Sequence, residues 1–216
     1  MSKKLLTASS YSMSVTLVLL MSIIMFSSSA VANEKKNIVI IGDSLSAAYG
    51  IPVASSWPQL LQQKLNKKNN AYNVINTSVS GDTSYTALNR SKTMLPQFKP
   101  DICLIAIGAN DGLQGLSLKQ LQANLRALVR LCKQYTNKIM LFEIKLPLNY
   151  GKVFVDRFAN IYHQVAKQTS ITLLPFFMES FAIDLSMFLS DRIHPAEPAQ
   201  AIMAKNVWQG LQELIK

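Results

Sequence analysis

The sequence predicts an α/β protein whose single domain is built on five parallel strands. Five short apolar runs rich in β-branched residues recur along the chain, at residues 38–41, 72–75, 102–107, 139–144 and 171–174. The runs are nearly continuously apolar rather than alternating, which is typical of strands covered on both faces. Helices on both sides of a parallel sheet provide that cover, so we expect three layers, α/β/α.

The segments between the runs have the period of amphipathic helices. Residues Ser56 to Gln59 have the pattern of a capping box, with Pro58 in the first turn, where proline is tolerated. A final helix is expected after Pro195 and Pro198. Apolar side chains three or four positions apart define one face of each of three helices: Leu118, Leu121, Leu125, Leu128 and Cys132; Phe154, Phe158, Ile161 and Val165; Met203, Val207, Leu211 and Leu214.

Residues 1–32 are predicted to be a signal peptide, which leaves the folded domain to residues 33–216. Two lysines precede an apolar stretch at residues 15–26, and Ala30-Val31-Ala32 fits a signal peptidase site. A membrane anchor is the alternative, but about a dozen apolar residues fall short of the roughly 20 that span a bilayer. No cysteine lies near the site, which argues against a lipid-modified N-terminus. We expect cleavage after Ala32 and a periplasmic or secreted protein.

The remaining chain is basic but lacks the pattern of a nucleic-acid-binding surface. Without the two leader lysines its formal charge falls from +10 to about +8. The basic residues are scattered, with Lys35-Lys36 and Lys67-Lys68 as the largest runs, and no aromatic residues alternate with them. This indicates a solvated basic surface with at most weak attraction to membrane surfaces and no nucleic-acid partner. We expect a monomer.

The two cysteines do not form a disulfide framework. Cys103 lies in a predicted strand and Cys132 on the apolar face of a predicted helix, so both have the character of small core residues. Export would permit a bond between them, and nothing in the sequence fixes their separation.

Polar motifs follow the predicted strands at one edge of the sheet. In an open parallel sheet, functional groups collect on the loops that leave the carboxyl ends of the strands. These loops carry four motifs: Gly42-Asp43-Ser44, Ser80-Gly81-Asp82-Thr83, Gly108-Ala109-Asn110-Asp111 and Asp191-Arg192-Ile193-His194-Pro195. The candidates for chemistry therefore converge on one edge.

Ser44 has three possible roles at the end of the first strand. It could cap a following helix. A phosphate ligand is excluded because the chain has neither G-x-G-x-x-G nor G-x-x-x-x-G-K-[ST]. The G-x-S-x-G elbow is also absent, since Ser46 occupies its second glycine. A cap and a nucleophile remain, with the N–H groups of an expected helix start beside the serine.

His194 is the better candidate base of the two histidines. His163 falls off the apolar face of its helix, which indicates an exposed and inert residue. Asp191 precedes His194 by three residues, and Pro195 biases the chain toward an extended conformation. A bend could bring the carboxylate to Nδ1 and leave Nε2 free as a base. Asp191 could equally close a turn, and the tetrad alone does not decide between the two.

Gly81 and Asn110 are candidates for stabilising an oxyanion. Gly81 can bring its N–H close to a ligand because it lacks a Cβ. Asn110 offers a side-chain amide, although asparagine is also a common turn residue. Each such donor is worth roughly 3 kcal/mol in acyl transfer. No His/Cys/Asp cluster has metal-ligand spacing, so no metal or cofactor is expected.

These four motifs, in this order, resemble the SGNH (GDSL) hydrolase family. Two further stretches that resemble one of its subfamilies are Leu146-Pro147-Leu148-Asn149-Tyr150-Gly151 and Leu174-Pro175-Phe176-Phe177-Met178. The similarity covers essentially the whole chain after the leader. It implies a flavodoxin-like fold, in which five strands form one parallel sheet.

The resemblance also implies the roles of the polar residues. Ser44 would be the nucleophile, His194 the base and Asp191 the carboxylate that orients it. The oxyanion hole would comprise the N–H groups of Ser44 and Gly81 and the side chain of Asn110. Two residues depart from the family: Ala109 and Arg192 stand where glycine is expected. These departures put substrate preference in doubt, but they remove no reacting group.

The implied reaction is a two-step acyl transfer on a small-molecule or lipid-like ester or thioester. Four leucines at the same edge could line a groove for the acyl chain or pack beneath their own loops: Leu113, Leu116, Leu146 and Leu148. A carbohydrate-ester deacetylase is the alternative enzyme. A non-catalytic lipid- or glycan-binding module is the alternative from another class, and a complete set of Ser44, Asp191 and His194 argues against it.

Overall fold

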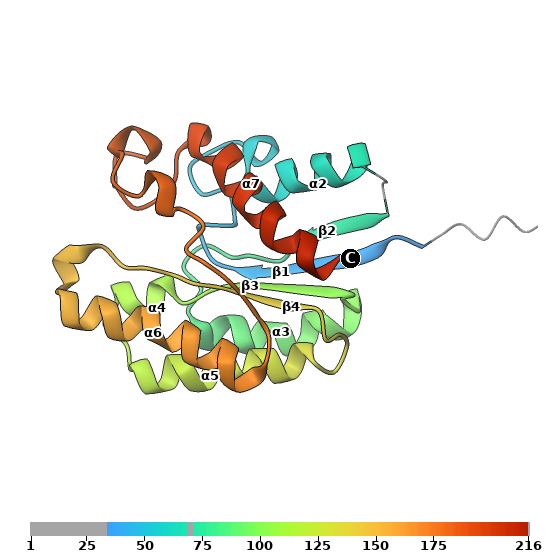
Figure 1. Ribbon diagram of the computed structural model, residues 1–216, viewed down its shortest axis with the longest axis horizontal. Coiled ribbons are helices and arrows are strands. Elements are labelled where there is room, and N and C mark those ends of the chain that lie inside the picture. The colour runs from blue at the N-terminus through green and yellow to red at the C-terminus, as the bar shows by residue number, and fades with distance from the viewer. Residues whose placement is uncertain (1–33, 69–70, 216) are drawn as a thin grey trace, which may run out of the picture. The chain divides into compact units, whose positions relative to one another are not determined.

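Five parallel strands form the centre of the protein in this computed structural model, which describes residues 34–68 and 71–215 (Figure 1). Their order across the sheet is β2-β1-β3-β4-β5. The strands are β1 (Lys36–Gly42), β2 (Tyr72–Asn76), β3 (Ile102–Ala106), β4 (Ile139–Phe142) and β5 (Thr172–Leu174). All five predicted runs therefore contain strands, and the predicted parallel sheet is confirmed.

The strands that lie inside the sheet are buried throughout most of their length. Every residue of β3 and β4 is buried, as the continuously apolar runs predict. The predicted runs extend past two strands: Ile107 and Ile144 are buried, but they lie in the loops at the carboxyl edge. The core thus continues under the loops that carry the polar motifs.

Helices cover both faces of the sheet, so the three-layer prediction is confirmed (Figure 1). Helices α2 (Trp57–Lys68) and α7 (Glu197–Leu214) lie on one face. The other face carries α3 (Ser84–Phe98), α5 (Leu118–Cys132) and α6 (Lys152–Thr169), with the short α4 (Ala109–Leu113) at the carboxyl edge. Single 3-10 turns complete the loops: η1 (Val53–Ser55), η2 (Leu148–Tyr150), η3 (Glu179–Phe181) and η4 (Leu185–Met187).

The predicted helix faces are those that pack on the sheet, with one shift at a boundary. Leu121, Leu125, Leu128 and Cys132 of α5 are buried, as are Phe158, Ile161 and Val165 of α6. Helix α7 begins at Glu197, so Pro198 lies within its first turn rather than before it. Proline is tolerated there because the first N–H groups of a helix have no intrahelical partner.

Trp57 connects the start of α2 to the strand ends. Its side chain is fully buried, and its indole N–H donates to the carbonyl of Leu45 at 3.1 Å. Its backbone N–H donates to Oε1 of Gln200 on α7 at 3.0 Å. The Ser56 hydroxyl, expected in a capping box, donates to the carbonyl of Val53. The indole hydrogen bond therefore restrains the backbone at Leu45, one residue after Ser44.

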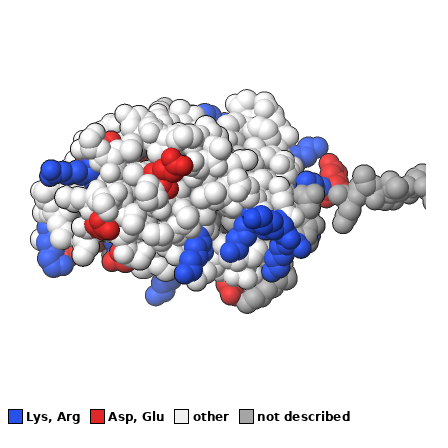
Figure 2. All heavy atoms as spheres, turned by 90° about the horizontal axis from the view of Figure 1, so that it is seen from above, with Lys and Arg blue, Asp and Glu red and all other residues white. Residues whose placement is uncertain are grey.

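The α2/α7 face carries part of the positive charge. Lys64 and Lys68 of α2 each place Nζ 5.2 Å from the centre of the Trp208 ring of α7. Figure 2 shows this face as mostly uncharged, with the largest group of basic side chains toward its right-hand end and single charged side chains around its edges. The arrangement fits the solvated basic surface that the composition predicts, because the lysine stems cover the indole.

Cys103 on β3 and Cys132 on α5 are buried and carry free thiols. A hydrogen bond with Cys132 and burial raise the pKa of the Cys103 thiol. Of the two possibilities the sequence leaves open, the structure has the small core residues and not the disulfide.

The predicted signal peptide lies outside the described residues. Within residues 34–68 and 71–215, no helix is both long enough and apolar enough to cross a membrane.

Candidate active site

Ser44, His194 and Asp191 form one chain of hydrogen bonds at the carboxyl edge of the sheet. Ser44 Oγ lies 2.9 Å from His194 Nε2, and His194 Nδ1 lies 2.6 Å from Asp191 Oδ2. The Asp191 side chain is 37% exposed and the His194 side chain 20%. The three groups come from the first strand end and the last loop, and the fold brings them within hydrogen-bonding distance.

Asp191 both closes a turn and holds the imidazole. Its Oδ1 accepts the N–H groups of Ile193 and His194, at 2.9 and 3.0 Å, while Oδ2 faces the ring. Asp191 therefore has both of the roles that the sequence leaves open: Oδ1 closes the turn, and Oδ2 contacts the imidazole. Arg192 between them has φ = 59°, a left-handed conformation that favours glycine. This explains why glycine would be expected at that position.

The ionisation of Asp191 sets the tautomer of His194. Burial raises the pKa of Asp191, but the hydrogen bonds from the backbone and ring of His194 and from Ile193 outweigh it and lower the pKa to about 2. The carboxylate is thus ionised at neutral pH and can only accept a hydrogen bond. The Nδ1 of His194 must donate, which leaves the lone pair of Nε2 for the Ser44 hydroxyl.

The backbone of His194 is held by a short antiparallel contact. Leu189 N–H donates to the His194 carbonyl at 2.8 Å, and Ala196 N–H donates to the Met187 carbonyl at 2.8 Å. Phe188 and Pro195 face each other in an isolated antiparallel bridge between these bonds. This extended pairing agrees with the bias that Pro195 imposes on the preceding residue.

The segment after Ser44 does not form the helix that we expect from the sequence. Residues 44–50 make consecutive turns, and the next α-helix begins only at Trp57. The N–H groups of Ser46 and Ala47 donate to the Asp43 carbonyl, and that of Leu45 donates to Asp43 Oδ1. Asp43 therefore caps this tight turn, which leaves the Ser44 side chain free to face His194.

Three N–H donors face the same edge. Among the described residues, the backbone N–H groups of Ser44 and Gly81 donate to no protein atom. Gly81 has φ = 86°. Asn110 donates one amide hydrogen to the Asp82 carbonyl at 2.9 Å, which fixes the side chain and leaves its second hydrogen. The three predicted oxyanion donors thus have hydrogen-bonding capacity to spare.

The sequence does not predict Arg90, which braces the loop that carries Gly81. The Arg90 guanidinium on α3 binds the Asp82 carboxylate through two nitrogens and donates to the Thr77 carbonyl. Because the carbonyl of Asp82 holds Asn110, this ion pair supports the Gly81 and Asn110 donors together. Asp82 and Arg90 are eight positions apart, a spacing with no helical signature.

A second buried network joins the loops of Gly81 and Asn110. Asp111 accepts the N–H of Ser84 at 2.7 Å and its hydroxyl at 2.6 Å, and Asn124 on α5 donates to that hydroxyl at 2.9 Å. All three residues are buried. The motif that contains Asp111 indicates a polar loop, but Ser84, which binds Asp111, lies 27 residues away. The sequence therefore has no local pattern that predicts this contact.

Gly108 is the position in this loop where only glycine fits. Its φ is 119°, and a Cβ there would lie 2.3 Å from the Tyr162 hydroxyl, which donates to the Ile107 carbonyl. Ala109, which departs from the resembled family, is the first residue of α4, a position that accepts alanine.

The four predicted groove leucines separate into two groups. Leu148 is 78% exposed and Leu116 is 41% exposed, whereas Leu113 is half-buried. Leu146 is only 5% exposed and packs against Gly112, so it lies beneath its loop rather than along an open groove. Tyr150, between Leu148 and α6, donates through its hydroxyl to the Leu113 carbonyl at 3.3 Å.

His163 lies outside this arrangement, on α6. Its side chain is half exposed, as we expect from the sequence, and its Nε2 lies 3.1 Å from Oε1 of the buried Glu143. Within the described part of the chain, no group of three or more His, Cys, Asp or Glu side chains could hold a metal ion.

Asp43 is a fully buried carboxyl beneath the site. Loss of solvation raises its pKa from 3.8 to about 7, although hydrogen bonds from the N–H groups of Leu45 and Ala109 oppose the rise; Asp111 and Asp82 add to it. Its Oδ2 and the buried hydroxyls of Ser46 and Ser78 have no hydrogen-bond partner among the described residues.

The chain is similar to a known family and to solved structures. Residues 40–202 match the GDSL-like lipase/acylhydrolase family. "Esterase TesA" of Pseudomonas aeruginosa is 38% identical over 83% of this chain and 90% of its own. "Thioesterase 1/protease 1/lysophospholipase L1" of Escherichia coli is 38% identical over 82% and 84%. The crystal structure of TesA aligns with a TM-score of 0.81, covering 83% of this chain and 99% of the other.

The raised pKa of Asp43 predicts how stability changes with pH. The unfolded chain releases this proton near pH 4 and the folded chain only near pH 7, so the group lowers the free energy of unfolding as pH rises between these values. Asp43→Asn cannot ionise. We expect the variant to match the wild type at pH 4 and to exceed its stability at pH 8 by up to about 4 kcal/mol.

Urea unfolding at pH 4, 6 and 8 checks this prediction. Asp156→Asn, at an exposed position paired with Lys152, is the control and should run parallel to the wild type. Parallel curves for Asp43→Asn and the wild type would show that Asp43 is ionised in the folded protein at acid pH.

Proposed function

Because the chain belongs to the GDSL-like lipase/acylhydrolase family, we propose that it hydrolyses carboxylic esters and thioesters of acyl chains through an acyl-enzyme on Ser44. The observation that carries this proposal is the chain of hydrogen bonds from Ser44 Oγ to His194 Nε2 and from Nδ1 to Asp191, at 2.9 and 2.6 Å. A serine paired with an oriented base is the arrangement that nucleophilic acyl transfer requires.

In the first step, Ser44 Oγ attacks the substrate carbonyl while its proton passes to His194 Nε2. The ionised Asp191 holds Nδ1–H and stabilises the imidazolium that forms. The tetrahedral intermediate collapses as the imidazolium gives its proton to the leaving alcohol or thiol. The products are the free leaving group and an ester between the acyl chain and Ser44.

In the second step, water takes the place of the Ser44 hydroxyl. His194 removes a proton from the water, which attacks the acyl carbonyl, and then returns the proton to Ser44 as the acid leaves. In both steps the developing oxyanion would lie against the N–H groups of Ser44 and Gly81 and the second amide hydrogen of Asn110. Donors fixed before the reaction stabilise the oxyanion without reorganisation.

The surface around the site supports an acyl chain rather than a carbohydrate as the bound group. The large apolar side chains that are exposed in the described residues all lie between the carboxyl end of a strand and the first turn of the next long helix. They are Tyr49, Val53, Val79, Tyr85, Leu116, Leu148, Tyr150, Val153, Ile183, Leu185 and Ile193. Exposed apolar side chains concentrated at one edge are typical of a surface that binds apolar ligands.

The name of the E. coli relative supports thioesters and lysophospholipids as substrates of this chain. We further propose that Leu113, Leu116 and Leu148 contact the acyl chain and that Leu146 supports them from beneath. Arg192, exposed beside His194, would place positive charge near the leaving group. The protein would act as a monomer with at most weak attraction to membranes.

Export is also part of this proposal. The basic start, the short apolar stretch and the Ala-x-Ala site in residues 1–32 support a cleaved signal peptide and a periplasmic or secreted enzyme. Lysophospholipids and other external esters fit that location better than coenzyme A esters, which are scarce outside the cytoplasm.

Removal of the Ser44 hydroxyl tests the proposed reaction. We expect Ser44→Ala to lower kcat by roughly 10⁵-fold or more, because no other group can form the acyl-enzyme. The substrates are p-nitrophenyl esters of two to sixteen carbons, an acyl thioester and a lysophospholipid. Ser80→Ala, an exposed serine in a neighbouring loop, is the matched control and should stay near wild type. Wild-type rates for Ser44→Ala on every substrate would refute the proposal.

Asn110 tests the oxyanion hole separately from the nucleophile. We expect Asn110→Ala to lower kcat by about 10²- to 10³-fold with a small change in KM, because its donor acts mainly in the transition state. Asn89→Ala on α3 is the control, and urea unfolding of each variant checks the fold. An unchanged kcat, or a loss confined to KM, would remove Asn110 from the oxyanion hole.

The N-terminus of the exported protein tests the signal peptide. When the full chain is expressed in a Gram-negative bacterium, we expect the intact mass of the soluble protein to begin at Asn33. A chain that retains residues 1–32 and sediments with the membrane would instead establish the anchor that the sequence leaves as the alternative.

A further inference from the structure

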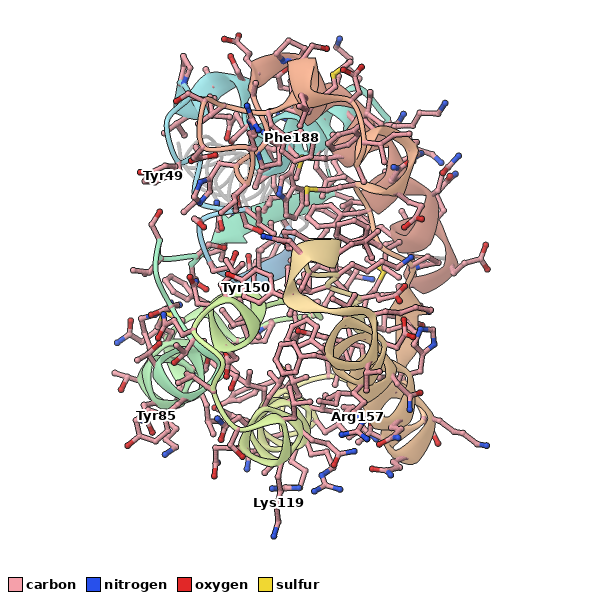
Figure 3. The ribbon with its side chains drawn as sticks, turned by 90° about the vertical axis from the view of Figure 1, so that its left-hand side faces the viewer. Tyr49, Tyr85, Lys119, Tyr150, Arg157 and Phe188 are labelled. Carbon is pink, nitrogen blue, oxygen red and sulfur yellow. The ribbon has the colours of Figure 1, made fainter. Side chains whose placement is uncertain are left out.

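The aromatic ring of Tyr49 covers the imidazole of His194. The ring centroids are 4.2 Å apart and the ring planes meet at 35°. Tyr49 is 49% exposed, and among the described residues its hydroxyl makes no hydrogen bond, so the ring contact is its main interaction. Figure 3, which looks onto the carboxyl edge, shows Tyr49 on the same side of this edge as Phe188 of the His194 loop.

The backbone on both sides of Tyr49 is shaped to present this ring. Ala48 has φ = 61° and Gly50 has φ = 70°. Alanine is disfavoured in the left-handed region, so the fold maintains this conformation at a cost in stability. Residues held in such conformations are frequent at functional sites. Tyr49 therefore projects from a constrained turn rather than from a flexible loop.

The same turn also contacts the backbone that holds His194. A Cβ on Gly50 would lie 2.5 Å from Cδ1 of Leu189, so these two residues are in close contact. The N–H of Leu189 donates to the carbonyl of His194 at 2.8 Å. One stretch of seven residues, 44–50, thus supplies Ser44, covers the imidazole with Tyr49 and packs against the partner of the His194 backbone.

We propose that Tyr49 is a positioning residue for His194, an inference that rests on the function proposed above. The ring confines the imidazole to the plane in which Nδ1 meets Asp191 and Nε2 meets Ser44. It also favours the imidazolium, because the face of an aromatic ring attracts a cation within about 6 Å of its centre. As the proton moves from Ser44 Oγ to Nε2 and the new bond to the carbonyl carbon forms, this attraction increases.

Three tyrosine variants test the role of the ring. We expect Tyr49→Leu to lower kcat by about 5- to 10-fold with little change in KM, because it removes the attraction and the confinement together. Tyr49→Phe keeps the ring and should remain within about twofold of wild type. Tyr135→Leu replaces a half-buried tyrosine between α5 and β4, at the opposite edge of the sheet, and is the matched control.

The pH dependence separates positioning from a structural role. If the ring stabilises the imidazolium, the acid limb of the kcat/KM profile of Tyr49→Leu should move to lower pH by about half a unit. Tyr49→Phe and Tyr135→Leu should keep the wild-type profile. An unmoved acid limb in Tyr49→Leu, or equal losses in Tyr49→Phe and Tyr49→Leu, would overturn the proposal.

The leaving group separates positioning from substrate contact. We expect Tyr49→Leu to lose the same factor on a p-nitrophenyl ester and on an acyl thioester, because His194 serves both. A loss confined to one of them would make Tyr49 a wall of the substrate site instead. Ser44→Ala in the same assays keeps the two proposals distinct. If Ser44→Ala is inactive and Tyr49→Leu equals the wild type, only the inference about Tyr49 fails.

Discussion

The parallel pairing of β1 with β2 and β3 is the constraint on which the site depends. It places Ile40 beside Asn76 and Gly42 beside Ala106, so three consecutive loops leave the sheet at nearly the same level. Ser44, Gly81 and Asn110 follow those strand ends, so their N–H donors lie at one edge of the sheet without any contribution from the last third of the chain. His194 and Asp191 then reach this edge from the loop that follows β5. The sheet thus positions Ser44, Gly81 and Asn110, and the last loop brings His194 and Asp191 to them.

The polar groups beneath the site show what this arrangement costs. Asp43 is fully buried, and in the described part of the chain one of its oxygens and the buried hydroxyls of Ser46 and Ser78, which lie close to Gly42, have no hydrogen-bond partner. A buried polar group without a hydrogen bond lowers stability by roughly 1 to 3 kcal/mol. The other buried polar side chains are hydrogen-bonded, Ser84, Asp111 and Asn124 among them, so the buried groups that lack partners lie where the chain turns sharply into Ser44. This distribution is common where a site is held in a strained conformation.

Most of the fold follows from sequence patterns, because strands buried on both faces and amphipathic helices leave strong periodic signals. The strands, the helix faces and the position of Ser44, Asp191 and His194 at one edge of the sheet could be predicted in this way.

The turn after Ser44 resembles a helix start in the sequence because serine and aspartate also cap helices, and only the hydrogen bonds to Asp43 distinguish the two. Tyr49 and Arg90 make contacts that no periodic sequence pattern predicts. The Tyr49 ring, for example, contacts His194, which lies far away in the sequence. Leu146 and Leu148 are two positions apart in one motif and identical in type, yet one is buried and the other exposed.

The hydrogen bond between Ser44 and His194 joins residues 150 positions apart, and β1 and the loop before α7 meet only in the finished fold. During synthesis Ser44, Gly81, Asn110 and Tyr49 emerge from the ribosome long before His194. Under the proposed mechanism, a chain without the final loop has no base and is inert toward esters. Activity through Ser44 would therefore also report that the chain has folded from β1 to the loop before α7.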